Sequence, residues 1–133
     1  MSATTSADAT MTVAARAPRW ATAAAYALGV FFAGLGLMRL LPIATDQWLF
    51  EDWGVPWWLR TGAAAAELLA GGLLFVRRLR ILGAVGVFTI MVSAGTMHAA
   101  LGHSMILSAL LNGLPAVLAA AVAWAHRRQL AVL

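Results

Sequence analysis

Cysteine is absent from the 133 residues of the sequence. Without it the chain cannot form a disulfide framework, a thiolate metal site, a cysteine-bound iron–sulfur centre or a CxxC redox pair. The sequence also shows no catalytic motif that would define a reaction, so a self-sufficient enzyme is not expected. If the protein takes part in redox chemistry, the redox group must come from a ligand or a partner.

Charged residues are also scarce, at 11% of the chain, against about 25% in an ordinary soluble domain. Hydrophobic residues make up 62%, and the mean hydropathy is +0.85. The chain is therefore expected to lie in a lipid bilayer. Its length allows four spans of about 20 residues with short connections, which leaves no room for a separate soluble domain.

Four apolar runs fit this expectation, and we predict an all-α fold, an integral membrane antiparallel four-helix bundle. The turns after the second and third runs are so short that neighbouring helices must be antiparallel. The first residues are small and polar, which indicates a disordered cytoplasmic tail. The apolar run that follows is too long for a signal peptide and has no A-x-A cleavage site. The predicted segments are a tail over 1–18, spans over 20–41, 57–76, 81–101 and 105–125 within a domain over 19–128, and a short tail over 129–133.

The basic residues, all of them arginine, indicate the orientation. Most fall on one side of the predicted bundle, whereas the other side carries at most Arg39 and Arg60 near three acidic residues. By the positive-inside rule, both termini are cytoplasmic. The net charge of +4 is thus explained by topology signals and does not indicate a nucleic-acid partner. The arginines assigned to the cytoplasmic side are Arg16, Arg19, Arg77, Arg78, Arg80, Arg127 and Arg128.

The complete replacement of lysine by arginine, together with abundant alanine, is typical of a GC-rich bacterial genome. The expected location is therefore the plasma membrane of a bacterium, with several passes through the bilayer.

The segment between the first two runs is rich in tryptophan. Tryptophan is enriched at membrane interfaces, so this segment is expected to lie in the headgroup layer. It either anchors the bundle as an aromatic belt or forms a lid over a lipid-soluble ligand. The tryptophans of this segment and of the start of the next span are Trp48, Trp53, Trp57 and Trp58.

One carboxylate, Glu67, falls near the middle of the second predicted span. An ionisable side chain at that depth costs about 2.5–3.5 kcal/mol to insert, so it is expected to face the bundle interior and to have a partner. Small residues at Gly62, Ala66 and Ala70 recur every four positions beside it and predict a seam for close helix contact.

Three residues are candidate partners of Glu67 in the outer half of the membrane. Arg39, near the end of the first span, is the expected partner, and His98 or Asn112 is the alternative. Together the four form a candidate ligand-binding or proton-relay site. Asn112 also lies close to Pro115, so it either satisfies the carbonyl that the proline leaves without a donor or donates to a ligand.

The histidines do not have the spacing of a metal site. His98 and His103 are five residues apart, or about 140° around a helix, whereas helical metal ligands favour i, i+3 or i, i+4. We therefore predict no metal site. His126 lies beside two arginines and is interpreted as another topology signal.

Three stretches carry a resemblance to known proteins: FFAGLGLMRLLP at 31–42, ELLAGGLLFVRRLRILGAVGVFTIMVSAGTMHA at 67–99 and AVAWAHRR at 121–128. They resemble the DoxX and DoxX-like small membrane proteins over roughly 25–128. Arg39, Glu67 and His98 match the family's recurring polar residues, with arginine where the family usually has lysine. The resemblance implies four membrane helices and, in some relatives, quinone-linked oxidation of sulfur compounds or membership of membrane oxidoreductase complexes.

Three functions are compatible with these features. The first is a small integral-membrane component of a redox-linked system, in which a polar pocket around Glu67 binds a quinone-like head group and a membrane or soluble oxidoreductase supplies the electrons. The alternative is a non-catalytic membrane anchor or assembly partner, in which Arg39 and Glu67 only fix helix packing. The third is a small-molecule transporter that acts as a homo-oligomer.

Overall fold

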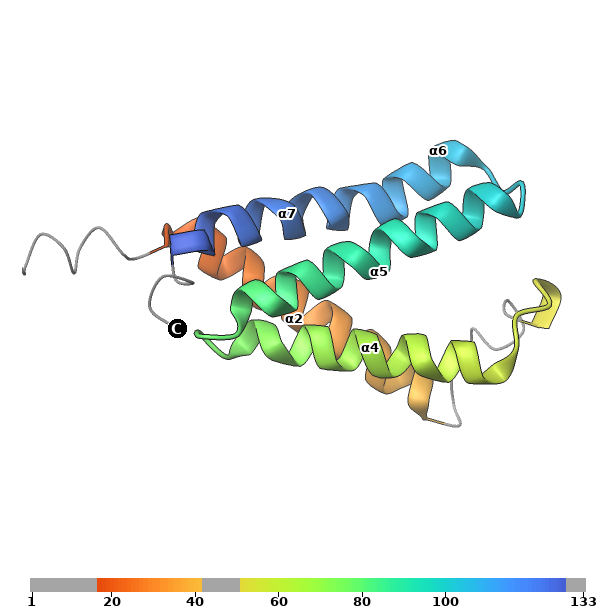
Figure 1. The fold of residues 1–133 in the computed structure, drawn as a ribbon, viewed down its shortest axis with the longest axis horizontal. Helices are drawn as coiled ribbons and strands as arrows, with labels where there is room; N and C mark the ends of the chain where they lie inside the picture. Colours follow the sequence, from red (N-terminus) through yellow and green to blue (C-terminus); the bar gives the residue numbers. More distant parts are fainter. Residues whose placement is uncertain (1–16, 42–50, 129–133) are drawn as a thin grey trace, which may run out of the picture.

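The computed structural model describes residues 17–41 and 51–128, and its helices form four long segments (Figure 1). The described residues contain no strand, so the predicted all-α class is confirmed for them. The segments are α2 (Arg19–Leu40), α4 (Trp57–Phe75), α5 (Arg80–Ala100) and a last one made of α6 (Met105–Ser108), the π-helix η1 (Ala109–Gly113) and α7 (Leu114–His126).

The four segments begin and end within one residue of the predicted spans. Pro18 and Pro56 stand directly before α2 and α4 in extended backbone conformation, as expected for a residue that cannot donate within a helix. Apart from residues 17 and 18, the predicted tails lie outside the described residues. Loop residues 42–50 lie outside them too. The predicted residues Arg16 and Trp48 therefore fall outside the described ranges.

Three of the four segments are long and apolar enough to cross a membrane: Arg19–Leu40, Arg80–Ala100 and Met105–His126. The sequence predicts four membrane spans, and these three are confirmed by their length and composition. The fourth, α4, has 19 residues but includes Arg60 and Glu67, which lower its hydropathy. Whether α4 crosses the membrane therefore depends on how its charges are accommodated.

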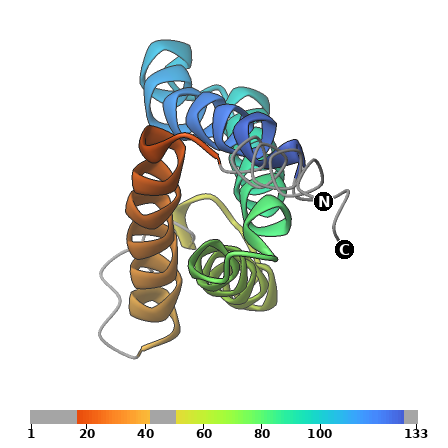
Figure 2. The same cartoon turned by 90° about the vertical axis from the view of Figure 1, so that its left-hand side faces the viewer.

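Glycines bring α2 and α4 into backbone contact. A Cβ at Gly36 would lie 2.5 Å from the Ala64 carbonyl oxygen and 2.5 Å from the Leu68 amide nitrogen, so only glycine fits there. A Cβ added at Gly29 would lie 3.1 Å from the Gly71 carbonyl oxygen, so α2 approaches α4 closely there too. A later residue of α2 thus opposes an earlier residue of α4, which means that the two helices run in opposite directions. Figure 2 shows that α2 is steeply inclined to α4.

The contact seam on α4 differs from the predicted one. Gly62 and Ala66 are exposed, and a Cβ at Gly62 would meet nothing within 4 Å. The contacts with α2 involve Ala64 and Gly71, while Ala70 lies against Gly83 of α5, whose added Cβ would lie 2.8 Å from the Ala70 carbonyl oxygen. The prediction was wrong because two helices contact α4 on different faces, and a run of small residues does not show which face meets which neighbour.

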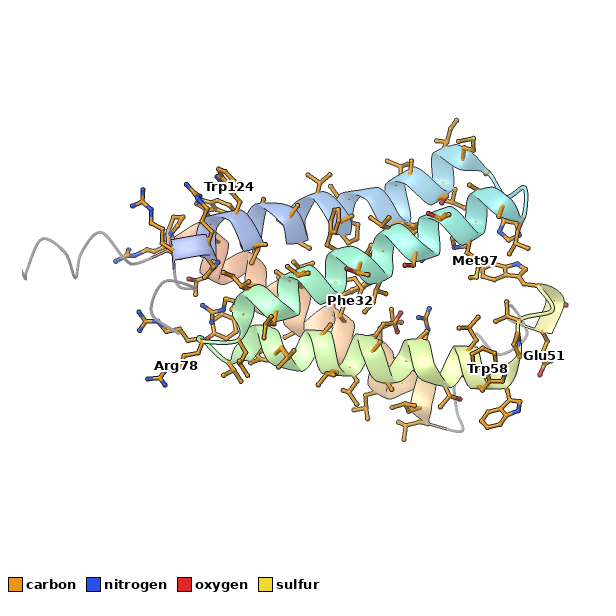
Figure 3. All side chains as sticks on the ribbon, in the orientation of Figure 1. Phe32, Glu51, Trp58, Arg78, Met97 and Trp124 are labelled. Carbon is orange, nitrogen blue, oxygen red and sulfur yellow. The ribbon has the colours of Figure 1, made fainter. Side chains whose placement is uncertain are left out.

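The interior of the bundle is apolar. The largest fully buried side chains include Phe32 of α2, Leu74 of α4, Val87 of α5 and Val122 of α7, so each long segment contributes to one core. Phe32 lies between the helices in Figure 3. The polar side chains described below are therefore held against a closely packed apolar framework.

Replacing Gly71 by alanine is expected to destabilise the protein by about 1–3 kcal/mol, the usual effect of overpacking a closely packed contact. The added Cβ would lie 2.9 Å from the Phe32 carbonyl carbon and 3.0 Å from Ala33 Cα. Gly72→Ala is the matched control, because a Cβ there meets nothing within 4 Å. Unfolding of both variants in detergent, followed by far-UV circular dichroism, measures the difference. Equal stability of the two variants would contradict the assigned α2–α4 contact.

Candidate functional site

An ion pair joins the last turn of α2 to the middle of α4. Arg39 Nη1 donates a hydrogen bond to Glu67 Oε1, with 21% of the arginine side chain and 4% of the glutamate side chain exposed. The carboxylate therefore faces the bundle interior, and Arg39 is a partner of Glu67, as expected from the sequence.

The backbone directions explain why these two residues meet. Helical side chains lean towards the N-terminus of their own helix. Because α2 and α4 run in opposite directions, Arg39 leans back along α2 while Glu67 leans towards the start of α4, and the two side chains approach each other. The close contact at Gly36, one turn before Arg39, reduces the distance that the side chains must bridge.

Pairing makes the burial of these charges tolerable. An isolated charge in a low-dielectric interior loses its hydration without compensation, whereas an opposite charge with a hydrogen bond offsets part of that loss. Glu67 on α4 can therefore remain in the bundle while it is joined to Arg39. Removing either partner would leave the other as a buried charge.

His98 and Asn112, the other two predicted members of the site, make contacts of their own. Asn112 Nδ2 donates to the Ser108 carbonyl oxygen at 3.1 Å and to Ser108 Oγ at 3.3 Å. This replaces the expected bond to the carbonyl of residue 111. Pro115 removes one backbone donor, and the helix widens into the π-turn η1 directly before it.

His98 pairs with His103, contrary to the spacing argument. Their Nδ1 atoms are 3.0 Å apart. That argument assumed a continuous helix, but α5 ends at Ala100 and the chain turns back at Gly102, whose φ is +73°. The His103 amide then donates to the His98 carbonyl oxygen at 3.1 Å, which holds the two residues side by side.

Trp53 completes this second cluster. Its ring lies 4.9 Å from the His98 ring and 4.8 Å from the His103 ring, measured between centroids. Of the predicted interfacial tryptophans, Trp53 is therefore part of a packed cluster, whereas Trp57 and Trp58 are 78% and 60% exposed. Trp58 lies at the same end of the molecule in Figure 3.

A third polar cluster lies at the opposite end of the bundle. The sequence predicted only signals of membrane orientation for its residues. Arg80 is 4% exposed and donates from Nε to the Leu74 carbonyl oxygen at 2.9 Å, with its guanidinium 5.1 Å from the centre of the Tyr26 ring. His126 is fully buried, with Nδ1 2.8 Å from the Val122 carbonyl oxygen and Nε2 3.5 Å from Arg80 Nη1. Because a carbonyl can only accept, the proton of a neutral His126 lies on Nδ1.

The sequence held a signal for this cluster. Arg80 precedes the buried Ala84 by four residues and Val87 by seven, and His126 follows the buried Val122 by four. Both therefore continue the inward face of their helices. The interpretation of Arg80 and His126 as topology signals only was incomplete. Arg77, Arg78, Arg127 and Arg128, by contrast, are exposed, and Figure 3 shows Arg78 pointing away from the helices.

The described residues contain no group of three or more histidine, cysteine, aspartate or glutamate side chains that could hold a metal ion. Comparison with protein-family models, curated proteins and solved structures finds no match to this chain. The resemblance to the DoxX and DoxX-like proteins therefore stays a prediction, and the site must be interpreted from its own chemistry.

Replacing Arg80 by methionine is expected to destabilise the protein by about 1–3 kcal/mol, because the buried Leu74 carbonyl loses a charged donor. Arg78→Met removes the same charge from an exposed position of the same turn and should change stability by less than about 0.5 kcal/mol. Thermal unfolding in detergent compares the two. If both variants melt together with the wild type, Arg80 has no structural role.

Proposed function

We propose that the protein is an integral membrane protein in which all four long segments span the bilayer as an antiparallel bundle. The pairing of Glu67 with Arg39 supports a span for α4, since it offsets the charge that separates α4 from the three more apolar segments. We also propose that both termini face the cytoplasm of a bacterium. In Figure 1 the start of α2, the turn between α4 and α5 and the end of α7 lie at one end, and all six described arginines of the predicted cytoplasmic set belong to these regions.

Within this architecture, the proposed function is that of a small membrane component of a redox-linked system that binds a quinone-like head group beside Arg39 and Glu67. The observation that carries this proposal is the buried ion pair at the middle of α4, in which 21% of the Arg39 side chain is exposed. A buried ionisable residue in a membrane helix is a common mark of a ligand or proton pathway.

The chemistry of the two side chains fits such a ligand. A guanidinium has five N–H donors, so Arg39 can donate to a carbonyl oxygen as well as to Glu67. The carboxylate of Glu67 can hold a proton on one of its oxygen atoms, beside the quinone oxygen that takes up a proton. When bound, a quinone would supply the two-electron chemistry, with electrons from a partner oxidoreductase, since the chain has no cysteine-bound redox centre.

The contacts of α2 with α4 favour a second candidate, a non-catalytic anchor or assembly partner. Gly36 and Gly71 bring the two backbones into contact next to the ion pair. This arrangement is expected if the ion pair fixes the position of α2 along α4. In this case Arg39 and Glu67 would orient the helices and bind no ligand.

The two candidates differ in what the purified protein carries. Detergent-purified wild type, Glu67→Gln and the exposed control Glu51→Gln are extracted and their quinone content is measured by mass spectrometry. The redox proposal predicts about one quinone per wild-type and Glu51→Gln molecule. The Glu67→Gln substitution removes the charge from a hydrogen-bonding group of the proposed site. The fraction of protein that carries quinone should therefore fall at least about tenfold when quinone is limiting.

Wild-type protein that carries quinone only in proportion to bulk lipid would refute the quinone site. If Glu67→Gln then also unfolds at lower temperature than Glu51→Gln, the ion pair has a structural role and the anchor becomes the supported function.

A further inference from the structure

The pair formed by His98 and His103 has the geometry of two ligands to one metal ion. Their Nδ1 atoms face each other at 3.0 Å, close enough for a single N–H···N hydrogen bond between neutral rings. One proton is shared between two nitrogen lone pairs in that arrangement. A metal ion can bind both nitrogens when this proton moves through solvent to Nε2 of the same ring, so that both imidazoles remain neutral.

The distance between the two nitrogens is compatible with their being neighbouring ligands of one metal ion. With metal–nitrogen bonds of about 2.0 Å, two nitrogens 3.0 Å apart subtend an angle of about 97° at the metal. Tetrahedral zinc needs an angle of about 109° and nitrogens about 3.3 Å apart. Neighbouring positions of a tetragonal or square-planar site are about 90° apart, a geometry that Cu²⁺ and Ni²⁺ adopt.

We propose that His98 and His103 bind one Cu²⁺ ion through their Nδ1 atoms at the end of the bundle formed by the turn after α5. Cu²⁺ also binds nitrogen ligands most strongly among the first-row divalent metals. Within the described residues, no third histidine, cysteine, aspartate or glutamate joins the pair. Two imidazole ligands give a lower affinity than the four protein ligands of a structural metal centre.

The fold supplies the support that such a site needs. The backbone bond from the His103 amide to the His98 carbonyl fixes the turn, and the positive φ of Gly102 lets the chain reverse within it. Trp53 lies against both rings and restricts their rotation. Both ligands are thus held in place before the metal arrives, which lowers the entropy lost on binding.

The test uses the full-length chain in detergent, purified without a histidine tag. One equivalent of Cu²⁺ is added, and electron paramagnetic resonance counts the coordinated imidazole nitrogens. Competition with a chelator measures affinity. The proposal predicts a tetragonal signal with two imidazole nitrogens. It also predicts that His98→Gln and His103→Gln each lower the affinity for Cu²⁺ at least about tenfold. Loss of a group that only orients a metal ligand already lowers metal affinity by that much.

Two variants act as controls. His126→Gln alters the remaining histidine, which lies at the opposite end, and should bind Cu²⁺ with two nitrogens wherever circular dichroism shows it folded. Trp53→Phe should keep the two-nitrogen signal but show less quenching of tryptophan fluorescence by Cu²⁺, because the Trp53 ring lies against both histidine rings.

The wild-type spectrum alone can overturn the proposal, whatever the stability of the variants. A signal of hydrated Cu²⁺, or of one imidazole nitrogen, would show that the pair does not chelate the ion. A two-nitrogen signal that persists in both His98→Gln and His103→Gln would place the copper elsewhere on the chain. Neither outcome bears on quinone binding, because Glu67 and Arg39 are absent from this cluster.

Discussion

The arrangement of α2 and α4 depends on a charge that an apolar bundle tolerates only when it is paired. Glu67 is almost fully buried near the middle of α4, and Arg39 is a cation that pairs with it. The pair can form because the two helices lie close together and their opposite directions make the two side chains lean towards each other. Gly36 and Gly71 allow that approach, because each stands where any side chain would collide with the neighbouring backbone. Electrostatics and backbone packing thus impose the same helix arrangement.

The remaining polar clusters lie towards the two ends of the molecule. One contains His98, His103 and Trp53, and the other contains Arg80 and His126. Between them, apolar side chains from all four segments fill the interior. In an apolar protein, this distribution leaves the ion pair as a charged group in the interior, separate from the two end clusters. A ligand that dissolves in lipid and forms hydrogen bonds would find its complementary groups there, whereas a water-soluble ion would first reach the ends.

Hydropathy predicted the helices well, because apolar runs bounded by proline, glycine and arginine leave few alternatives. The cost of a buried carboxylate likewise pointed to Arg39 as a partner of Glu67. Features that depend on chain reversal or on helix rotation were missed. The contact between His98 and His103 arises from the turn at Gly102, which a helical-wheel argument ignores. The small residues of α4 indicated close contact but not which of two neighbours each face meets, and the burial of Arg80 was hidden by its resemblance to a topology signal.

A double-mutant cycle on Arg39 and Glu67 tests the central claim most directly. Unfolding free energies in detergent are measured for wild type, Arg39→Met, Glu67→Gln and the double variant. Polar pairs between membrane helices couple by about 0.6 kcal/mol on average and by at most about 1.7 kcal/mol, whereas breaking a buried ion pair costs about 3–5 kcal/mol. The account predicts a coupling energy above about 1.7 kcal/mol, with the double variant less destabilised than the sum of the single ones. A coupling energy at or below about 0.6 kcal/mol would show that the pair does not hold α2 against α4, and would contradict it.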